Sequence, residues 1–597
     1  MPDLPFDLAS LRAAYATGTT PVDVVEDVYR RIAAHADPGV FIHLLPKEQA
    51  LAAARALPPF ADAADMPLWG IPFAIKDNID LAGVPTTAGC PAYAYTPEAD
   101  AHCVARLRRA GAIAIGKTNL DQFATGLVGV RSPYPIPRNA IDPAIVPGGS
   151  SSGSAVAVAA GLVGFALGTD TAGSGRVPAA LNNIVGLKPS LGMLSCGGVV
   201  PACRSLDTIS IFALTVADAH AVLAAAAAFD PADAYSRPLP VRPLSPPPPA
   251  FRVGVPDPAG RRFFGDTVQA ASFAASLTQL EAMGADIVEL DFEPLYAVAE
   301  LLYDGPWVAE RYAAIEAMMR DRPEAVHPVT RQVIAKAENY TAVDAFRGVY
   351  RLMELKQRVA PALAAVDLLC VPSIPTFVTR ADLEADPLGP NTRLGTYTNF
   401  VNLLDLCGIA VPVAPRSDGR PGGVTLLAAA GQDHAVAGLA AALHASAGVT
   451  CGATGHPAPA APPATAGAGP DEFALAVVGA HMSGLPLNGD LTRLGGRFLR
   501  RTRTAPCYRL YALPGGPPHK PGLVRHDDGA AIELEVWALP ERALGAFLRT
   551  VPAPLGIGTL TLEDGSPVKG FLCEAIGVRE AADITVHGGW RSFLAAR

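Results

Sequence analysis

The segment PGGSSSGSAVAVAAGLVGFALGTDTAGSGR, residues 147–176, decides how this chain folds and acts. It contains two glycine-rich turns, one around Ser150 and one around Ser174, joined by an apolar, alanine-rich run. Glycines permit positive φ and leave backbone N–H groups unobstructed by side chains. A serine hydroxyl beside such amides supplies the nucleophile and the anion-stabilising donors that acyl transfer requires. The segment therefore predicts a serine-dependent acyl-transfer site built from two turns.

Ser174 is the predicted nucleophile, because it lies in the second turn, G-T-D-T-A-G-S-G-R, at residues 168–176. The backbone amides of Thr171, Ala172, Gly173 and Ser174 are the predicted oxyanion hole. Each such donor contributes about 3–4 kcal/mol to transition-state stabilisation in comparable chemistry. This turn is therefore expected to hold both the nucleophile and the donors that stabilise the charge it creates.

A base must remove the proton of Ser174, and no histidine near it in the sequence is placed to do so. No G-x-S-x-G elbow surrounds Ser174 either. A lysine serves as a base only when it is neutral, and burial without a carboxylate partner lowers its pKa in that direction. Lys76 follows the apolar run I-P-F-A-I at residues 71–75, so we expect it to be buried. Ser150 is expected to bridge Lys76 and Ser174, since a hydroxyl both donates and accepts.

Lys76, Ser150 and Ser174, with their surrounding motifs, resemble the amidase signature family of Ser-cisSer-Lys hydrolases. The resemblance extends through V-G-L-K-P at residues 185–189 and N-L-L-D-L-C-G-I-A-V-P at residues 402–412. It implies that Ser174 attacks the carbonyl, that Ser150 in a cis peptide shuttles the proton, and that Lys76 is the base. It also implies an α/β fold with a large mixed β-sheet surrounded by helices. Two departures are Ser152 and Ala172, which stand where many members carry glycine.

Within that family the chain resembles the allophanate hydrolases, on the A-G-S-G-R run at residues 172–176 and a distinct C-terminal region. This resemblance implies that Tyr303 and Arg311 bind the substrate, a small urea-like amide that ends in a carboxylate. A guanidinium fork suits a carboxylate, and Arg176 is a further candidate for that contact. In one helix Tyr303 and Arg311 would share a face, but Gly305-Pro306 between them favours a kink or a break.

Two proline-rich stretches divide the chain. Arg237–Ala250 is expected to be an extended connection within the first domain, and Gly452–Pro470 a semi-rigid linker. We therefore predict an amidase domain at residues 1–451, the linker at residues 452–470 and a smaller α+β domain at residues 471–597.

The smaller domain resembles the C-terminal domain of allophanate hydrolases, which has a gamma-glutamyl cyclotransferase-like fold. That resemblance implies decarboxylation of the first product, N-carboxycarbamate. His481 and Glu574 are the candidate residues of a polar site there. The alternative is a domain that serves assembly alone.

The composition limits the partners. A net charge of −9 gives no reason to expect nucleic acid, and the apolar stretch at residues 154–168 is too short to span a bilayer. The N-terminal residues carry no basic region followed by an apolar run, so a cytoplasmic location is expected. The nine cysteines include no C-x-x-C pair, which argues against a metal site. We expect a small carboxylated urea-like substrate, no metal or organic cofactor, and a homodimer.

Four alternatives remain at this point. The string G-A-I-A-I-G-K-T at residues 111–118 matches a phosphate-binding loop, but its intervening residues predict a strand. A general amidase, or a subunit of a tRNA-dependent amidotransferase, would keep the chemistry and change the substrate. A nitrilase-type cysteine, Cys196 or Cys203, lacks the glutamate and lysine that it would need. A non-catalytic protein on an amidase scaffold is disfavoured because Lys76, Ser150 and Ser174 are all present.

Overall fold

The computed structural model describes residues 4–458 and 467–597, which divide into two compact units. The second unit combines the C-terminal residues with two earlier segments, Arg242–Arg252 and Glu281–Asp286. Part of the proline-rich stretch expected within the first domain thus belongs to the second unit. One contact that holds it there is a hydrogen bond of 2.8 Å from Arg497 Nη1 to Ser245 Oγ. Within the predicted linker, residues 459–466 lie outside the described residues.

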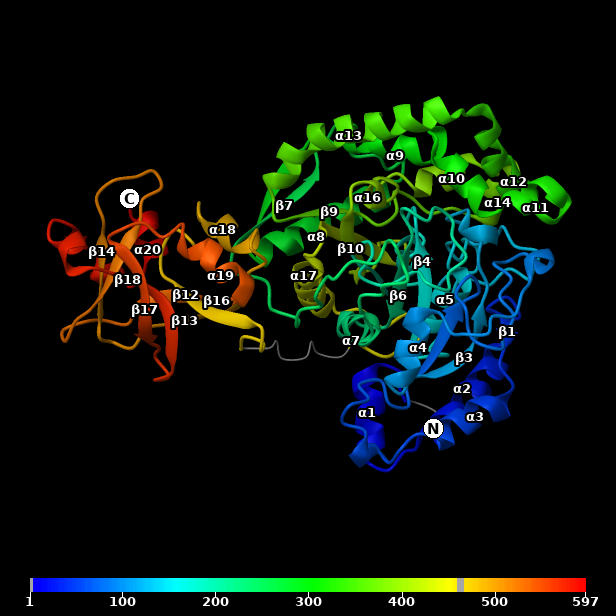
Figure 1. Cartoon of the computed structure of the whole chain (residues 1–597), viewed down its shortest axis with the longest axis horizontal. Coiled ribbons are helices and arrows are strands. Elements are labelled where there is room, and N and C mark those ends of the chain that lie inside the picture. The colour runs from blue at the N-terminus through cyan, green and yellow to red at the C-terminus, as the bar shows by residue number, and fades with distance from the viewer. Residues whose placement is uncertain (1–3, 459–466) are drawn as a thin grey trace. The chain divides into compact units, whose positions relative to one another are not determined.

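The first unit is built on an eleven-stranded mixed β-sheet (Figure 1). Strand β2 pairs in parallel with β3 and β4, whereas β10 pairs antiparallel with β5 and β11. This confirms the expected large mixed sheet. In spatial order the strands are β1 (Phe41–Leu44), β3 (Ile113–Thr118), β2 (Pro72–Lys76), β4 (Phe165–Asp170), β6 (Thr208–Ala213), β5 (Val185–Lys188), β10 (Leu406–Val413), β11 (Gly422–Ala429), β9 (Leu368–Pro372), β7 (Phe251–Pro256) and β8 (Ala285–Leu290).

Helices surround this sheet, and its central strands are buried along their whole length. Strands buried on both faces are continuously apolar, which explains runs such as F-A-L in β4. Helix α5 (Ser152–Ala159) lies against β2 and β4 and is itself fully buried. Its small residues, S-G-S-A-V-A-V-A, permit this close approach. None of the described helices is both long and apolar enough to cross a membrane.

The other helices that precede the proline-rich stretch are short or amphipathic. Helix α2 begins after Thr20, whose side chain forms a capping box with Asp23, as the T-P-V-D sequence favours. The helices are α1 (Leu8–Ala16), α2 (Pro21–His35), α3 (Lys47–Arg55), α4 (His102–Arg109), α6 (Val177–Leu181) and α7 (Val216–Ala226).

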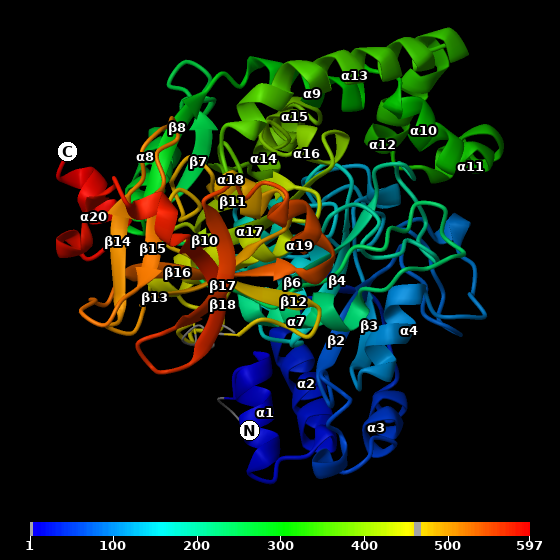
Figure 2. The ribbon, with the colours of Figure 1, turned by 60° about the vertical axis from the view of Figure 1, so that its left-hand side comes forward.

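A second set of helices follows α8 (Thr267–Ala282). Helix α9 (Glu293–Asp304) ends before Gly305-Pro306 and α10 begins at Trp307, so the chain breaks the helix where this pair favours it. The long helix α13 (Ala342–Ala364) packs on α9 (Figures 1 and 2). The rest are α10 (Trp307–Ala314), α11 (Glu316–Asp321), α12 (Pro328–Ala335), α14 (Arg380–Ala385), α15 (Gly389–Leu394), α16 (Phe400–Leu403) and α17 (Asp433–Ser446).

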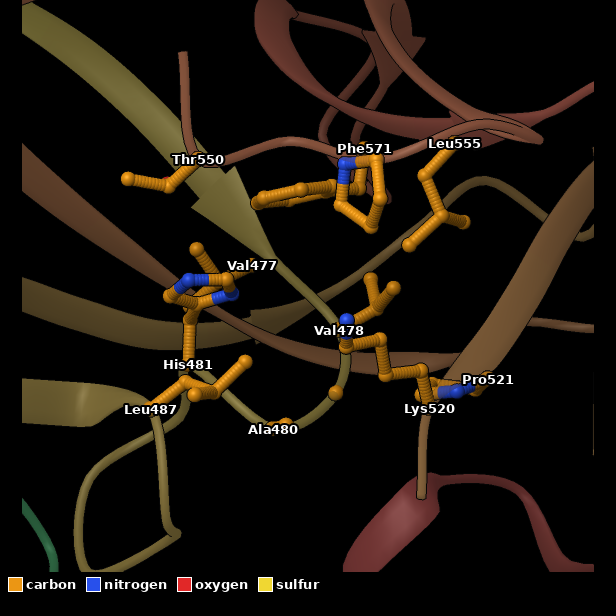
Figure 3. A pocket seen from close by; sticks show the side chains of 12 residues that line it. Val477, Val478, Ala480, His481, Leu487, Lys520, Pro521, Thr550, Leu555 and Phe571 are labelled. Carbon is orange, nitrogen blue, oxygen red and sulfur yellow. The ribbon is translucent and has the colours of Figure 1, made fainter. Parts of the chain in front are cut away.

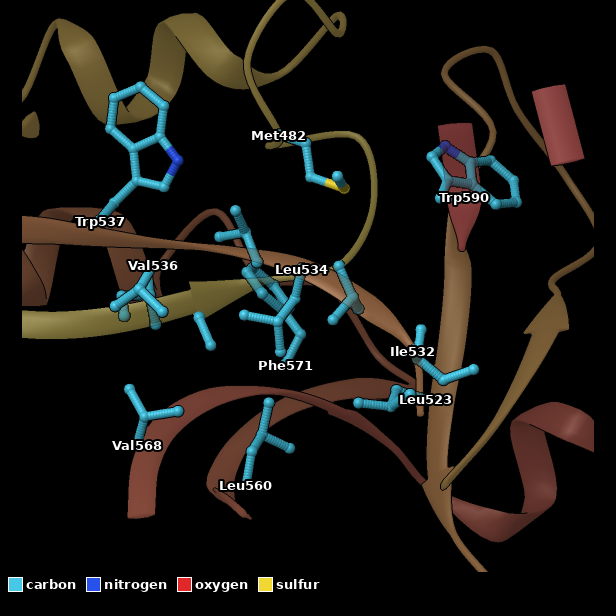
Figure 4. Packing of buried hydrophobic residues seen from close by; sticks show 14 of the residues in the cluster. Met482, Leu523, Ile532, Leu534, Val536, Trp537, Leu560, Val568, Phe571 and Trp590 are labelled. Atoms are coloured by element: carbon cyan, nitrogen blue, oxygen red, sulfur yellow. The ribbon is translucent and has the colours of Figure 1, made fainter. Parts of the chain in front are cut away.

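The second unit contains a five-stranded and a three-stranded sheet. Trp537 and Trp590 anchor its core together with aliphatic residues of several strands (Figure 4). The first sheet runs β13 (Arg497–Arg503), β16 (Glu533–Pro540), β12 (Glu472–Val477), β18 (Pro567–Cys573) and β17 (Leu555–Thr561), and the second β15 (Pro521–Arg525), β14 (Tyr508–Ala512) and β19 (Ala582–Asp583). The helices are α18 (Asn488–Thr492), α19 (Glu541–Leu548) and α20 (Trp590–Ala595).

Candidate active site

Lys76 is the last residue of β2 and is completely buried. Its Nζ donates hydrogen bonds of 2.7 Å to Ser150 Oγ and 2.7 Å to Thr169 Oγ1. The structure thus brings together two of the three residues predicted to act in catalysis. Thr169, in the G-T-D-T motif, was not predicted to take part. A threonine hydroxyl holds the amine in place without adding a charge that would keep it protonated.

The environment of Lys76 favours the neutral amine. Burial lowers its pKa to about 7, and the nearby carboxylates of Asp121, Asp207 and Asp170 oppose that shift only in part. Among the described residues, no carboxylate forms an ion pair with Lys76. A large fraction of Lys76 is therefore neutral near pH 7, which is the state that a base requires.

The turn that carries Ser150 is held by Asp121. The Gly149–Ser150 peptide bond is cis, and the Ser150 carbonyl accepts a hydrogen bond of 3.0 Å from the Asp121 amide. A Cβ atom on Gly149 would lie 2.0 Å from Asp121 Oδ2, so only glycine fits there. The Asp121 carboxylate also accepts from the amides of Gly129 at 2.9 Å and Arg131 at 2.8 Å. Asp121 thereby joins three backbone segments around the turn.

The turn that carries Ser174 is organised by Asp170, the last residue of β4. The Asp170 carboxylate accepts hydrogen bonds of 3.0 Å from the amides of both Gly173 and Gly175. Asn402, in the segment predicted to close the family resemblance, donates to the Asp170 carbonyl at 2.9 Å. These contacts fix the backbone on either side of the predicted nucleophile.

Ser174 is 3% exposed, and its side chain has no hydrogen-bond partner within the described part of the chain. The structure therefore forms the Lys76–Ser150 bond and leaves the predicted Ser150–Ser174 bond unmade. Catalytic hydrogen bonds of this kind often tighten only when substrate is bound. The Ser174 hydroxyl is accordingly not committed to another group.

The predicted oxyanion hole needs one correction. The Gly173 amide donates to Asp170, so it is not directed at a substrate oxygen. The amides of Thr171, Ala172 and Ser174 have no partner among the residues that the structure describes. Thr171 is further fixed by a short hydrogen bond from its hydroxyl to Asp207. Three of the four predicted donors thus stay available.

Arg176 also differs from its predicted role. Its side chain is completely buried and pairs with Asp170 through Nε at 2.9 Å and Nη2 at 2.9 Å. Nη2 donates in addition to the Thr398 carbonyl at 3.2 Å. Although burial by itself would raise it, the Arg176 charge holds the pKa of Asp170 below its ordinary value. The fork of Arg176 therefore binds Asp170 and braces the turn of Ser174, in place of the predicted substrate contact.

Arg311 and Tyr303 meet across the break between α9 and α10. Arg311 Nη2 donates to the Tyr303 hydroxyl at 3.2 Å, and the guanidinium lies 4.9 Å from the centre of the Tyr303 ring. Arg311 is 1% exposed and forms no ion pair with any described carboxylate. Its Nε has no hydrogen-bond partner among the described residues. A buried cation without a counter-ion is costly, so this arrangement is suited to an anionic ligand.

Thr125 links Arg311 to a second buried arginine that the sequence did not indicate. Its hydroxyl accepts from Arg311 Nη1 at 3.3 Å, and its carbonyl accepts from Arg131 Nη1 at 3.1 Å. Burial lowers the pKa of Arg131, and the Arg311 charge contributes to that shift. The region around Tyr303 therefore carries two positive charges, an arrangement suited to a carboxylate.

The phosphate-binding alternative conflicts with the structure. Residues 113–118 form strand β3, and Lys117 is completely buried in it. Its Nζ lies 3.2 Å from Asp77 Oδ1 and donates to Thr86 Oγ1 at 2.9 Å. The lysine of that string is therefore a structural residue.

The cysteine-nucleophile alternative is also disfavoured. Burial raises the pKa of the Cys196 and Cys203 thiols, which disfavours either as a nucleophile.

His481 lies in a small, mainly apolar pocket of the second unit, with a volume of about 30 Å³ (Figure 3). The ring stacks on Phe571 at 5.1 Å, and burial lowers its pKa to about 4. Lys520 is the one cationic residue among those that line the pocket. Glu574 is exposed and is not among the residues that line this pocket, so the structure does not bring the two candidate residues together there.

A model of the Amidase family matches residues 23–437. The chain belongs to the amidase family. It is an amidohydrolase, as the resemblance implied. A second family model, the Allophanate hydrolase C-terminal domain, matches residues 473–595. Among the described residues of this amidase, no cluster of three or more His, Cys, Asp or Glu side chains is placed to hold a metal ion.

Known proteins are similar to this chain over both of its domains. Allophanate hydrolase of Kluyveromyces lactis aligns with a TM-score of 0.79 and 39% identity, over 99% of each chain. Urea amidolyase of Saccharomyces cerevisiae is 45% identical over 93% of this chain. The chain spans about a third of that longer protein, 31% of its length. A glutamyl-tRNA(Gln) amidotransferase subunit of Nitratidesulfovibrio vulgaris is 35% identical, over 70% of this chain and 92% of its own.

Proposed function

We propose that this amidase hydrolyses allophanate, the N-carboxylate of urea, at its terminal amide. The observation that carries the proposal is Arg311, a buried cation with no carboxylate partner in the described structure. Its partner Tyr303 packs against the hydrophobic cluster that includes Ala172 of the Ser174 turn. A substrate carboxylate on this guanidinium would supply the missing counter-ion. The similarity to allophanate hydrolase over the full length supports the same substrate.

The proposed reaction begins with attack of Ser174 Oγ on the terminal amide carbon. Ser150 takes the proton of Ser174 and passes its own to neutral Lys76, to which it is already hydrogen-bonded at 2.7 Å. The amides of Thr171, Ala172 and Ser174 stabilise the oxyanion. The C–N bond then breaks, and the proton on Lys76 returns through Ser150 to the leaving nitrogen, which departs as ammonia. Water hydrolyses the acyl-enzyme by the same relay and releases N-carboxycarbamate.

The nitrogen of N-carboxycarbamate takes up a proton as one C–N bond breaks and carbon dioxide leaves, and protonation of the resulting carbamate gives ammonia and a second carbon dioxide. We propose that the C-terminal domain promotes this step at the pocket of His481 and Lys520. Lys520 supplies a positive charge for the dianion, and His481 supplies an uncharged donor. We further propose a cytoplasmic homodimer as the working form.

A second candidate, a general amidase or amidotransferase subunit, would share Lys76, Ser150 and Ser174. The amidotransferase relative matches only 70% of the chain. A neutral amide substrate would also leave the buried Arg311 cation without a counter-ion. This favours a carboxylated substrate over a neutral amide.

The test measures ammonia and carbon dioxide released from allophanate, biuret, malonamate and an aliphatic amide, with Ser174→Ala as the control. We expect turnover of allophanate and malonamate only, and none with Ser174→Ala. His481→Ala should leave the first ammonia unchanged and delay carbon dioxide. Equal turnover of the neutral amides would contradict the substrate assignment, and normal carbon dioxide release by His481→Ala would contradict the role of its pocket.

A further inference from the structure

Thr125 is a buried residue that two buried arginines share. Its hydroxyl accepts a hydrogen bond of 3.3 Å from Arg311 Nη1, and its carbonyl accepts one of 3.1 Å from Arg131 Nη1. The hydroxyl donates in turn to the Phe123 carbonyl at 3.1 Å. Because the proton of the hydroxyl is used on Phe123, its lone pairs remain for the guanidinium of Arg311.

The buried arginines of the described chain fall into two groups. Those of the first group form ion pairs with carboxylates, and they are Arg176, Arg416 and Arg497. Arg131 and Arg311 form no ion pair with a described carboxylate, and both are bonded to Thr125. A hydroxyl or a carbonyl satisfies a guanidinium N–H without cancelling its charge. Thr125 thus holds two buried cations and supplies no counter-ion to either.

The loop that carries Thr125 has an unusual backbone conformation. Phe123 and Ala124 both have a φ of 51°, in the left-handed region that residues with a Cβ atom rarely adopt. Such backbone persists only where surrounding contacts determine it, and it is concentrated at binding and active sites. Here Phe123 belongs to the same buried cluster as Ile315, which directly follows α10, the helix of Arg311. The loop is therefore held in place by the helices that it contacts.

The same loop is bonded to the turn of Ser150 on both sides of the cis peptide. The Asp121 amide donates to the Ser150 carbonyl at 3.0 Å, and the Gly149 amide donates to the Leu127 carbonyl at 2.9 Å. One loop therefore contacts the proton relay and, through Thr125, the candidate carboxylate-binding arginine. Since the two groups must meet opposite ends of one small substrate, this loop sets the spacing between them.

We infer that Thr125 is a specificity-determining positioning residue, which holds Arg311 on the loop of Ser150 through an uncharged hydroxyl and so keeps the guanidinium available to a substrate carboxylate. This role rests on the proposed function, hydrolysis of an amide that ends in a carboxylate. Lys76 is held in a parallel way, by the hydroxyls of Ser150 and Thr169. A carboxylate in place of the Thr125 hydroxyl would pair with Arg311 and compete with the substrate.

The first test compares Thr125→Asp with Thr125→Asn, two side chains of equal size that differ in charge. Each is combined with Ser174→Ala, and the Kd of malonamate is measured by titration calorimetry. Thr125→Asp should raise the Kd at least about tenfold, because its carboxylate takes the place of the ligand carboxylate on Arg311. Thr125→Asn offers an uncharged acceptor and should keep the Kd within about threefold of its value with Thr125 intact. A circular dichroism melt checks that each variant is folded.

A double-mutant cycle measures whether Thr125 acts through Arg311, and it does not depend on the folding of Thr125→Asp. Thr125→Val is similar in shape and removes the hydroxyl, so it should raise the Kd of malonamate about three- to tenfold. Thr125→Ser should restore the original Kd. In an Arg311→Met background Thr125→Val should raise the Kd no further, because the group that Thr125 positions is gone.

The outcomes separate the role of Thr125 from the proposed function. Equal Kd values for Thr125→Asp and Thr125→Asn, or an equal rise for Thr125→Val with and without Arg311, would overturn the role of Thr125 alone. Failure of the Ser174→Ala chain to bind malonamate would overturn both that role and the carboxylated substrate. Malonamate binding that responds to Thr125 as expected, in a chain that releases no ammonia from allophanate, would support the role and contradict only the proposed substrate.

Discussion

Two arginines of the first unit are almost equally buried, and they differ in what neutralises them. Arg176 is 0% exposed and lies against the Asp170 carboxylate, whereas Arg311 is 1% exposed and is bonded to the uncharged Tyr303 and Thr125. The Asp170–Arg176 ion pair neutralises both charges and holds the turn of Ser174, although Arg176 Nη1, like Arg311 Nε, has no hydrogen-bond partner among the described residues. Arg311 is incomplete without an anion. Burial alone therefore does not separate a structural arginine from a binding one; the partner does.

The comparison has a chemical basis. A buried ion pair is costly to break because the remaining charge has neither water nor a partner. Burial would lower the pKa of Arg311, but Tyr303 and nearby acidic groups hold it above its ordinary value, so the guanidinium stays charged. The folded chain thus tolerates an unpaired cation beside the proposed substrate. A site of this kind is already arranged to receive a carboxylate, and it need not form on binding.

The largest effect is expected for Arg176→Met, which leaves Asp170 buried and unpaired. We expect the free energy of unfolding to fall by about 3–5 kcal/mol, measured by denaturant titration. The matched control is Arg320→Met, which breaks a solvent-exposed pair with Asp321 and should leave the free energy of unfolding nearly unchanged. A loss for Arg176→Met as small as that of the control would place Arg176 with Arg311, as an arginine the fold does not need.

The opposite result is expected for Arg311→Met, because it removes a cation that lacks a partner. The free energy of unfolding should be unchanged or higher. The value of kcat/KM for allophanate should fall roughly 10–100-fold, because a hydrogen bond to a charged group contributes about 1.5–3 kcal/mol. The slow turnover of an aliphatic amide is the internal control and should not change. Strong destabilisation, or an equal loss with both substrates, would contradict a carboxylate-binding role.

These two arginines also mark the limit of prediction from the sequence. The turns around Ser150 and Ser174 and the burial of Lys76 follow from local glycine and apolar patterns, so they were predictable. The orientation of the Arg176 side chain depends on its ion pair with Asp170. Both residues lie in the same motif, and the sequence of that motif does not predict that they pair. The same limit applies to Glu574, which directly follows β18, is exposed and does not line the His481 pocket, because the sequence does not reveal which side chains the folded chain brings to that pocket. The mixed sheet was predictable as a class, whereas the transfer of Arg242–Arg252 to the second unit rests on contacts such as Arg497 with Ser245.

A smaller effect, and a separate one, is expected from pH. Burial lowers the pKa of Lys76 to about 7, and the base must be neutral, so kcat/KM should rise tenfold per pH unit below 7 and level off above it. The guanidinium of Arg311 stays protonated throughout this range. Arg311→Met should therefore lower the whole pH profile without moving its midpoint. A midpoint displaced by one pH unit or more would mean that Arg311 changes the pKa of Lys76 and does not bind the carboxylate. Arg176 and Arg311 would then differ in how each affects the catalytic base, and no longer in whether each binds the substrate.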